Sequence, residues 1–361
     1  MTGPRPSDRS LKGRAARSNR SGRFESLARE EFDDGWDAPE DDVPRRVDAT
    51  VLIDHPRTVI ARNNSPDVGF DRSINPYRGC EHGCIYCYAR PAHAYLGLSP
   101  GLDFETRIFA KTDAAETLRR ELSSPRYRCA PIHIGGDTDP YQPIERRLGL
   151  TRQIIEVLGA FRHPFSIITK SALIQRDLDL LGPLARQDLV KAAVSVTTLD
   201  RRLARSMEPR AATPERRIET IRRLSEAGVP VTVMFAPVIP GLNDHELEAV
   251  LETAARAGAR GAGYVALRLP RELSSLFREW LEAEQPDRAG RVMSLVRQMR
   301  GGRDYDADWA QRMTGQGPLA TLLRQRFRTA TKRLGLNQTR HELDVSLFVR
   351  PPRAGDQLDL F

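Results

Sequence analysis

Cysteine is scarce in this chain of 361 residues: there are four, and three of them, Cys80, Cys84 and Cys87, lie within eight positions. A disulfide framework spreads its cysteines through a short secreted chain, so this distribution excludes that class of protein. Long apolar runs are also missing, since none approaches the roughly 18 residues of a membrane span, and the N-terminus lacks a signal-peptide core. We therefore expect a cytoplasmic protein without a membrane partner. The fourth cysteine, Cys129, is expected to be a buried small residue.

Charge is abundant, with a net charge of +8 and a pI near 9.6. Such a balance favours a polyanion partner, although solvated arginine-rich helix faces explain it as well. Residues 1–23 are basic and residues 25–42 are acidic. Because charge blocks bury little surface, residues 1–44 are predicted to be a disordered charged tail. The alternative is a basic arm that lies on nucleic acid.

From Asp48 onward, β-rich runs alternate with helical runs, the order of parallel βαβ units in an α/β fold. Strands are predicted over residues 104–111, 131–136, 165–170, 192–197, 230–236 and 263–267. Helices are predicted between them, over residues 113–122, 150–161, 176–185, 214–227 and 244–257. This period fits a barrel or a doubly wound sheet. Residues 45–270 are assigned to the core, 271–345 to a helical extension with helices at 271–284 and 288–300, and 346–361 to a flexible tail.

The clustered cysteines form a Cys-x3-Cys-x2-Cys motif within residues 75–90. Three thiolates this close can hold three irons of a cubane iron–sulfur cluster, which takes four cysteines when it is fully ligated by protein. The fourth iron is then open to a small molecule. Gly79 and Gly83 permit the tight turns that let the sulfurs converge. The alternative is a zinc site completed by His82 or His93.

This run resembles the signature of the radical S-adenosylmethionine (radical SAM) superfamily, in which an aromatic residue, here Tyr86, precedes the last cysteine. The resemblance implies a partial (β/α)6 TIM-like barrel with its chemistry at the C-terminal strand ends. It implies a 4Fe-4S cluster on Cys80, Cys84 and Cys87, with S-adenosyl-L-methionine (SAM) on the open iron through its amino and carboxylate groups. Reductive cleavage of SAM would give a 5′-deoxyadenosyl radical that abstracts hydrogen from a substrate. An electron donor of the flavodoxin or ferredoxin type is the implied partner.

Two predicted strand ends carry candidate SAM ligands. Gly135, Gly136 and Asp137 resemble the glycine-rich motif that holds the SAM amino group, and an ordinary Asp-Pro turn is the alternative. Asp137 and Asp139 are expected to bind the amine or to cap the next helix. Lys170 is expected to meet the SAM carboxylate, as a matching lysine does in spore photoproduct lyase. As the alternative, it is an exposed lysine at a strand end.

The next two strand ends continue the pattern. Ser195 and Thr197 alternate with two valines, so their hydroxyls bind ligand if that strand face is the barrel lumen, and are ordinary satisfied hydroxyls if it is not. Val238 and Ile239 lie in a segment that resembles the one that packs the adenine of SAM. The alternative is a proline-rich loop in which Asn243 or Asp244 caps the following helix.

Tyr86 and Tyr88 flank the last cysteine, and together with the Asp-Pro-Tyr-Gln-Pro loop at 139–143 they resemble the spore photoproduct lyase-related, DNA-repair-photolyase-like subgroup. The resemblance covers roughly residues 71–269 and implies a DNA-lesion lyase in which these tyrosines take part in catalysis. The lyase also has a cysteine after its second strand, where this chain has Asp137. Repair of spore photoproduct itself is therefore not expected. A radical SAM enzyme for RNA, a peptide or a metabolite stays open, as does a non-catalytic metal-binding nucleic-acid adaptor.

The chain ends after Pro351 and Pro352 in five residues that resemble the pentapeptide by which bacterial polymerases and repair proteins dock on the sliding clamp. Two apolar anchors on a free end suit a hydrophobic groove. This motif predicts a clamp as a further partner, and a tail that packs on its own domain is the alternative. The motif consists of Gln357, Leu358, Asp359, Leu360 and Phe361.

Overall fold

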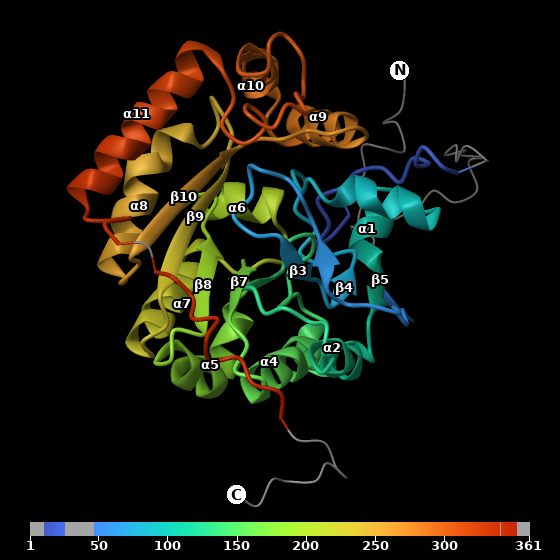
Figure 1. Ribbon diagram of the computed structural model, residues 1–361. Helices are drawn as coiled ribbons and strands as arrows, with labels where there is room; N and C mark the ends of the chain where they lie inside the picture. The colour runs from blue at the N-terminus through green and yellow to red at the C-terminus, as the bar shows by residue number, and fades with distance from the viewer. Residues whose placement is uncertain (1–10, 26–46, 340, 352–361) are drawn as a thin grey trace, which may run out of the picture.

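A computed structural model describes residues 11–25, 47–339 and 341–351 of the chain. Its centre is a seven-stranded sheet with the order β10-β9-β8-β7-β6-β3-β2. Six of these strands are parallel and neighbour one another in chain order, and β2 (Ala61–Arg62) pairs antiparallel at the edge. The six are β3 (Arg72–Ile74), β6 (Ile132–Ile134), β7 (Phe165–Thr169), β8 (Val190–Ser195), β9 (Val231–Val238) and β10 (Gly261–Ala266). Figure 1 shows the sheet curving as the predicted partial (β/α)6 barrel requires.

Amphipathic helices cover the outer face of this sheet, because alternate strand residues bury apolar side chains against them. In β8, Val190, Ala192 and Val194 belong to the main hydrophobic core. The covering helices are α2 (Ala114–Leu122), α4 (Leu150–Ala160), α5 (Leu178–Ala185), α7 (Pro214–Glu226) and α8 (Leu247–Arg256). Each lies where a helix was predicted. The start of α7 shows the local cause, since the Thr213 hydroxyl accepts from the Arg216 N–H and Pro214 occupies the first turn.

The strand predicted over residues 104–111 is wrong in part. Residues Leu102–Thr106 form the short helix α1, and only Arg107–Ala110 form a strand, β5. This strand lies between β1 (Thr50–Ile53) and β4 (Tyr77–Arg78) in a separate three-stranded sheet. The first barrel strand is instead β3, which was not predicted because three residues with one arginine and one serine carry no strand pattern.

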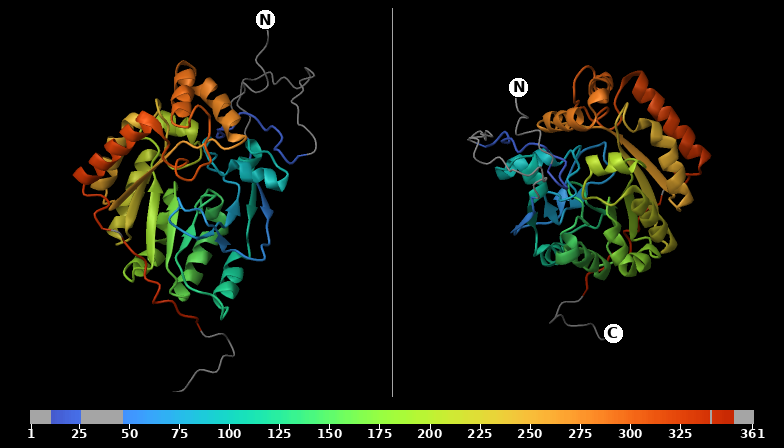
Figure 2. Two further views of the ribbon diagram at one scale, coloured as in Figure 1. Left: turned by 45° about the horizontal axis from the view of Figure 1, so that its top comes forward. Right: turned by 180° about the vertical axis from the view of Figure 1, so that it is seen from behind.

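The C-terminal extension closes one side of the barrel. Its helices α9 (Leu273–Glu284) and α10 (Pro286–Gln298) lie near the predicted positions, and α11 (Gly317–Arg333) follows them. The Trp280 indole N–H of α9 donates to the Ser206 carbonyl in α6 (Arg201–Met207), 3.1 Å away. The ring of Phe327 in α11 packs 4.8 Å from that of Tyr264 in β10. Figure 2 shows these helices stacked along one edge of the domain.

The disorder predicted for residues 1–44 is wrong for residues 11–25, which pack on the domain as an ordered strap. Ala15 and Ala16 are buried, and Arg14 donates to the carbonyls of Glu105 and Val47. Three more strap arginines pair with glutamates of α9 or just before it: Arg17–Glu284, Arg20–Glu279 and Arg23–Glu272. These four arginines therefore bind partners within the fold, and residues 1–10 of the predicted basic arm lie outside the described residues. Local charge counting missed the strap because its partners lie far along the chain.

The tail predicted to be flexible from residue 346 is also ordered as far as Pro351. The Phe348 ring packs 5.5 Å from His163 and 6.2 Å from Phe161, and the Val349 N–H donates to the Phe161 carbonyl. The five clamp-motif residues lie outside the described residues. No helix in the described ranges is long and apolar enough to cross a membrane.

Candidate active site

The three cysteines lie on a loop between β4 and the 3-10 helix η2 (Arg90–Leu96). Cys80 and Cys84 are buried, and Cys87 is partly exposed. Gly79 and Gly83 have φ angles of +77° and +65°. A Cβ on Gly83 would stand 2.7 Å from a carboxylate oxygen of Glu105, and one on Gly79 would stand 3.0 Å from the His93 ring. The glycines are therefore needed both for the turns and for the close packing of the loop.

A buried ion pair supports this loop from behind. The Arg90 guanidinium lies 2.5 Å from the Glu105 carboxylate, and both side chains have no exposed surface. Arg90 also donates to the carbonyls of Gly83 and Cys84, each at 2.9 Å. The Glu105 carboxylate accepts in addition from the N–H groups of Ala15 and Ala16 in the strap. The loop carbonyls are thus held toward Arg90.

The surroundings of the sulfurs suit binding to a cationic iron core. Burial raises the pKa of all three thiols, so free thiolates are disfavoured. The Asp139 N–H at Cys80 and the Ala89 N–H at Cys87 act in the opposite direction. Hydrogen bonds of this kind also tune iron–sulfur clusters. A positive core removes the penalty of burying the thiolates, which is the physical reason that the site fits a cluster.

The zinc alternative fits poorly. Within the described ranges, no three His, Cys, Asp or Glu side chains converge closely enough to hold one metal ion. A cubane relaxes this demand because each thiolate binds a different iron. Both candidate histidines are engaged elsewhere, since His93 Nε2 lies 3.1 Å from the Arg107 carbonyl and His82 Nδ1 lies 3.3 Å from the Asp139 carboxylate. Burial lowers the pKa of His93 to about 4, as expected for a neutral packed ring.

The loop after β6 approaches the neighbouring strand ends at the position predicted for the glycine-rich motif. Gly135 has φ +95°, and a Cβ there would stand 2.7 Å from Pro140 and 2.8 Å from the Ile168 carbonyl. Gly136 has room for a Cβ, and its carbonyl accepts from the Tyr88 hydroxyl. The role of both glycines toward the SAM amino group stays a prediction.

The two aspartates of this loop differ in the contacts that their carboxylates make. Asp139 is saturated: it accepts from the Thr169 hydroxyl and the Lys170 N–H, each at 2.7 Å, and from the Tyr141 N–H at 2.9 Å. Burial acts to raise its pKa, but His82 and these donors hold it at about 2. Asp139 therefore joins strand ends and neither caps a helix nor stays free for an amine. The exposed Asp137 carboxylate has no hydrogen-bond or ion-pair partner in the part of the chain that the structure describes, so it keeps the predicted role.

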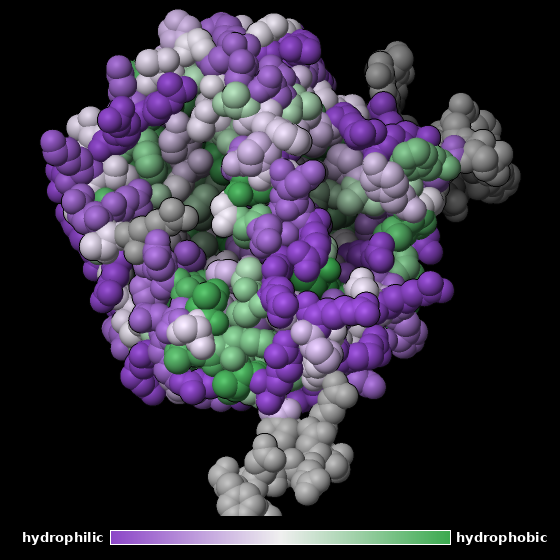
Figure 3. Space-filling view, in the orientation of Figure 1, coloured by the Kyte–Doolittle hydropathy of each residue, from purple (hydrophilic) through white to green (hydrophobic). Residues whose placement is uncertain are grey.

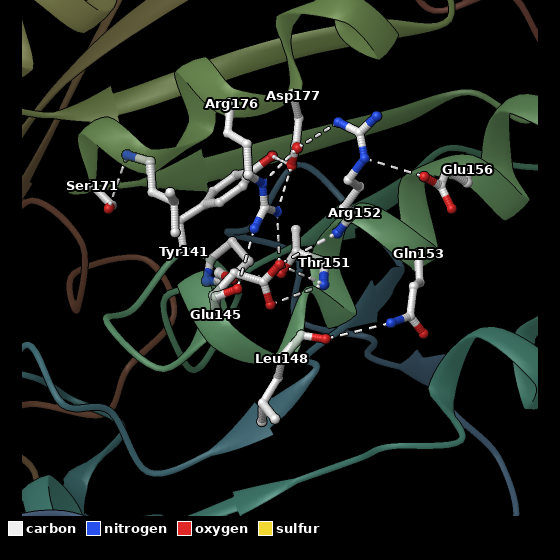
Figure 4. A network of polar contacts seen from close by, with 12 residues as sticks. Tyr141, Glu145, Leu148, Thr151, Arg152, Gln153, Glu156, Ser171, Arg176 and Asp177 are labelled. Atoms are coloured by element: carbon white, nitrogen blue, oxygen red, sulfur yellow. Dashed lines mark hydrogen bonds and ion pairs between the residues drawn. The ribbon is translucent and has the colours of Figure 1, made fainter.

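A network of charged side chains anchors the same loop (Figure 4). The Arg176 guanidinium bridges Glu145 at 2.9 Å and Asp177 at 2.8 Å, and both carboxylates are fully buried. The Tyr141 hydroxyl donates to Asp177 at 3.0 Å, and Arg152 pairs with the same carboxylate. Since Tyr141 follows Asp139 by two residues, this network fixes the loop against α4 and α5.

Lys170 lies at the end of β7 and faces the cluster loop. Its ammonium stands 5.8 Å from the centroid of the Tyr86 ring and helps to stabilise the thiolate forms of Cys84 and Cys87. Among the described residues, its ammonium makes no ion pair or hydrogen bond. An unpaired cation beside the three sulfurs suits the predicted contact with the SAM carboxylate.

Ser195 and Thr197 lie on the lumen side of the β8 segment, which is the first of the two predicted alternatives. Val194 and Val196 point into the outer core. Thr197 points the other way, and its hydroxyl oxygen lies 3.1 Å from the Tyr86 hydroxyl. Thr197 also donates to the Glu208 carboxylate at 2.6 Å, so its hydroxyl is satisfied. Ser195 is buried on the same strand face, and its contact with SAM stays a prediction.

The two tyrosines occupy different environments. Tyr86 is 7% exposed, and its hydroxyl is tied to Thr197. Tyr88 is 43% exposed, and its hydroxyl donates to the Gly136 carbonyl. Of the two predicted catalytic residues, Tyr88 is therefore the one with an exposed side chain, and the catalytic role of both stays a prediction.

Val238 and Ile239 are predicted to lie in a segment that packs the adenine of SAM through apolar side chains and backbone, and this role stays a prediction. Both side chains are fully buried, Val238 in the main core and Ile239 against Ile85 and Tyr86 of the cluster loop. The Asn243 side chain does not cap the 3-10 helix η4 (Asp244–Glu246) that follows it. Its amide accepts from the Ile239 N–H at 2.6 Å and donates to the Thr197 carbonyl at 2.8 Å. The segment therefore braces the ends of β8 and β9.

Sequence reasoning missed Arg268, which follows β10. Its guanidinium carbon lies 4.7 Å from the centroid of the Tyr88 ring, and its Nε is buried without a hydrogen-bond partner. Its nearest polar contact is the Met313 sulfur, 3.6 Å from Nη1. The available signal was its place directly after the sixth predicted strand, since barrel chemistry gathers at those ends. Figure 3 shows the face of the molecule seen in Figure 1 hollowed near its centre, with apolar residues at depth and hydrophilic residues around them.

Comparison with known proteins places this site in context. Residues 74–254 match the family described as the Radical SAM superfamily. An uncharacterized protein of Mycobacterium tuberculosis is 40% identical over 236 residues, which cover 65% of this chain and 69% of that protein. A protein of Pseudomonas phage M6, named radical SAM Nalpha-GlyT isomerase, is 28% identical over 173 residues, covering 47% of this chain and 34% of that one.

Among solved structures, spore photoproduct lyase in complex with dinucleoside spore photoproduct is similar, with a TM-score of 0.54 and 16% identity over 79% of this chain and 80% of the lyase chain. A variant of the same lyase with bound AdoMet and the dinucleoside gives a TM-score of 0.52 at 16% identity, with the same coverage of both chains. At this identity the likeness shows the fold alone.

Proposed function

Since the chain belongs to the radical SAM superfamily, whose cofactors are a 4Fe-4S cluster and SAM, we propose that it acts on a base in a nucleic acid, with a DNA lesion as the first candidate. The contact between Arg268 and Tyr88 carries this proposal. An arginine plane on an exposed aromatic ring, beside the cluster loop, suits a stacked base and its phosphate. The basic net charge supports the same substrate class. Further support comes from spore photoproduct lyase, which has a similar fold and holds a dinucleoside photoproduct in its structure.

The residues of this chain divide the work as follows. Cys80, Cys84 and Cys87 hold the cluster, and Lys170 and Asp137 receive the carboxylate and the ammonium of SAM. When bound, the cluster would supply one electron to the sulfonium of SAM, whose C5′–S bond would break to give methionine and a 5′-deoxyadenosyl radical. Lys170 contributes a fixed charge, and the buried Tyr86 keeps water from the sulfurs on the β8 side.

Tyr88 is our candidate for the residue that exchanges a hydrogen atom with the substrate. No cysteine follows β6, because Asp137 stands there, and Cys129 precedes this strand at the opposite end of the barrel. A tyrosine hydroxyl, whose ordinary pKa is about 10, is protonated at neutral pH, and desolvation raises the pKa of Tyr88 further. The Tyr88 hydroxyl donates to the Gly136 carbonyl, so its O–H lies at the loop that follows β6.

The test is anaerobic reconstitution with iron and sulfide, followed by reduction with dithionite in the presence of SAM. We expect 5′-deoxyadenosine in every reaction, and a faster release when a lesion-bearing oligonucleotide is added. The Arg268→Ala variant should raise the oligonucleotide concentration for half-maximal stimulation about tenfold, which corresponds to about 1.4 kcal/mol. Its cleavage of SAM without substrate should not change, because Arg268 contacts Tyr88 and not Lys170.

Other outcomes separate the alternatives. Stimulation by RNA, a peptide or a metabolite extract, but not by DNA, would reject the DNA substrate and retain the enzyme. A digest of modified nucleosides from deletion cells then distinguishes RNA from the other two. Absence of 5′-deoxyadenosine under all conditions would support the metal-binding adaptor instead.

We also propose that the C-terminal motif at 357–361 binds a sliding clamp. The described tail supports this partner by its position. Phe348 packs on Phe161 and His163, which precede β7, so Pro351 leaves the domain at the end of the barrel opposite to Lys170. A clamp held there would leave the cluster end accessible. Calorimetry with the full chain and with a version that ends at residue 356 tests this, and equal binding by both would reject it.

A further inference from the structure

A basic pocket lies beside α6, the helix whose Met207 carbonyl accepts from the Ile85 N–H of the cluster loop. It has a volume of about 550 Å³ and is formed by α6 and the turn that leads into α7. Arg201, Arg202 and Arg205 line it, together with Glu208 and several small residues. All three arginines are exposed. Arg201 pairs with Glu215 at 3.2 Å, whereas Arg202 and Arg205 have no ion-pair partner among the described residues.

The charge of this surface is strongly one-sided. Residues 201–216 contain five arginines and two glutamates. One of the glutamates, Glu208, is 2% exposed and already bound to Arg217. The potential at the pocket mouth is therefore positive, and an acidic partner is attracted to it over about a Debye length, near 8 Å at physiological salt.

The pocket walls touch the cluster loop directly. The Met207 carbonyl accepts from the Ile85 N–H at 3.0 Å, and Met207 packs against Cys84 and Ile85. Glu208 accepts from Thr197 at 2.6 Å, and Thr197 in turn lies 3.1 Å from the Tyr86 hydroxyl. Glu208, which lines the pocket, and its neighbour Met207 therefore connect the pocket with the cluster loop.

The same packing keeps substrates out. Tyr86, Thr197 and Glu208 are 7%, 0% and 2% exposed, so the direct path from the pocket to the cluster loop is filled by packed side chains. A base or a phosphate held in the pocket therefore cannot reach the reacting atoms by this path. An electron needs no channel, because it passes through bonded and packed atoms.

From this we infer that the pocket of Arg201, Arg202 and Arg205 is the docking site of a small acidic electron-transfer protein, a flavodoxin or a ferredoxin. The donor loses one electron and the cluster gains it, and no proton or group is transferred. Electrostatic complementarity of this kind raises the rate of encounter and makes it sensitive to salt. The inference depends on the superfamily chemistry and not on the proposed substrate, so either can fail alone.

The test compares two reductants on the full-length reconstituted enzyme. The R202E/R205E variant should raise the flavodoxin concentration for half-maximal 5′-deoxyadenosine release at least tenfold. Its rate with dithionite, which needs no docking site, should stay within twofold of the wild type. The matched control is R328E/K332E, which makes the same change of charge at a second basic pocket, of about 500 Å³, on α11. The control should behave as the wild type with both reductants.

Three results would overturn the inference. One is an unchanged flavodoxin requirement in R202E/R205E, and another is an equal loss in R328E/K332E. The third is weakened binding of an oligonucleotide by R202E/R205E with an intact flavodoxin response, because it would make the surface a nucleic-acid interface. If R202E/R205E fails to hold iron, the neutral variant R202Q/R205Q decides by the same comparison. The difference in flavodoxin requirement between R202E/R205E and the wild type should also shrink as the salt concentration rises, since screening weakens the attraction in the wild type.

Discussion

Replacing Glu105 by glutamine removes the carboxylate that pairs with Arg90 behind the cluster loop. Both side chains have no exposed surface, so the guanidinium would stay buried without its counter-charge. Breaking a buried pair in this way costs about 3–5 kcal/mol. Arg90 keeps the carbonyls of Gly83 and Cys84, and also those of Pro100 and Gly101, as acceptors. We therefore expect a loss near the lower limit, about 3 kcal/mol in the free energy of unfolding.

The loss should reach the cluster, because Arg90 fixes the carbonyls on both sides of the Gly83–Cys84 bond. Urea unfolding of the metal-free protein under anaerobic conditions measures the stability. The rate at which a chelator removes iron from the reconstituted protein measures the loop, and we expect Glu105→Gln to release iron several times faster than the wild type.

Glu284→Gln is the matched control for this prediction. It removes the same charge from a strap arginine pair, Arg17–Glu284, whose glutamate is 34% exposed. A surface pair of this kind contributes about 1 kcal/mol or less. Equal losses in the two variants, or a loss below about 1 kcal/mol in Glu105→Gln, would refute the claim that the buried charge pair holds the cluster loop.

Two further changes test the scaffold and the glycine-rich loop. Arg278 and Arg297 form ion pairs with Asp304. Burial acts to raise the pKa of the Asp304 carboxyl, but the two arginines hold this pKa at about 2, below the usual 3.8. The stabilisation is therefore present above about pH 4 and lost as the pH falls through 2, so Asp304→Asn should cost about 1–2 kcal/mol at pH 7 and much less near pH 2 in urea titrations. A constant difference at both pH values would contradict this. Gly135→Ala should lower the free energy of unfolding by about 1–3 kcal/mol, because the residue has a φ of +95° and its Cβ would stand 2.7 Å from Pro140. The same variant should bind SAM more weakly, as measured by equilibrium dialysis. Gly136→Ala is the control, because there is room for a Cβ at that position. Equal effects of the two variants would exclude the steric explanation for Gly135.

Much of the site could be predicted because its members are close in sequence or share one sheet edge. Cys80, Cys84 and Cys87 are neighbours along a short loop, so no tertiary information was needed to group them. Gly135, Lys170 and Ser195 each end or follow a parallel strand, and the carboxyl ends of such strands meet whatever the details of the packing. The apolar periods of the helices and of five of the barrel strands were strong enough to place them.

Other features of the fold depend on details that a periodic pattern does not contain. Val238 lies on the core face because the pairing of β9 and β10 shifts register between Tyr264 and Ala266. Such an irregularity reverses the face on which the following side chains lie. The first barrel strand, β3, is too short to show any period.

The sequence alone determined the grouping of the three cysteines and the order of five barrel strands with their helices, because ligand spacing and amphipathic periods are local properties of the chain. Only the tertiary structure decided how the strap at 11–25 is held, why Tyr88 and not Tyr86 has an exposed side chain, and where Arg268 and the basic pocket of α6 lie. These features join residues that are far apart in the chain, and their positions follow from packing and charge pairing across the whole domain.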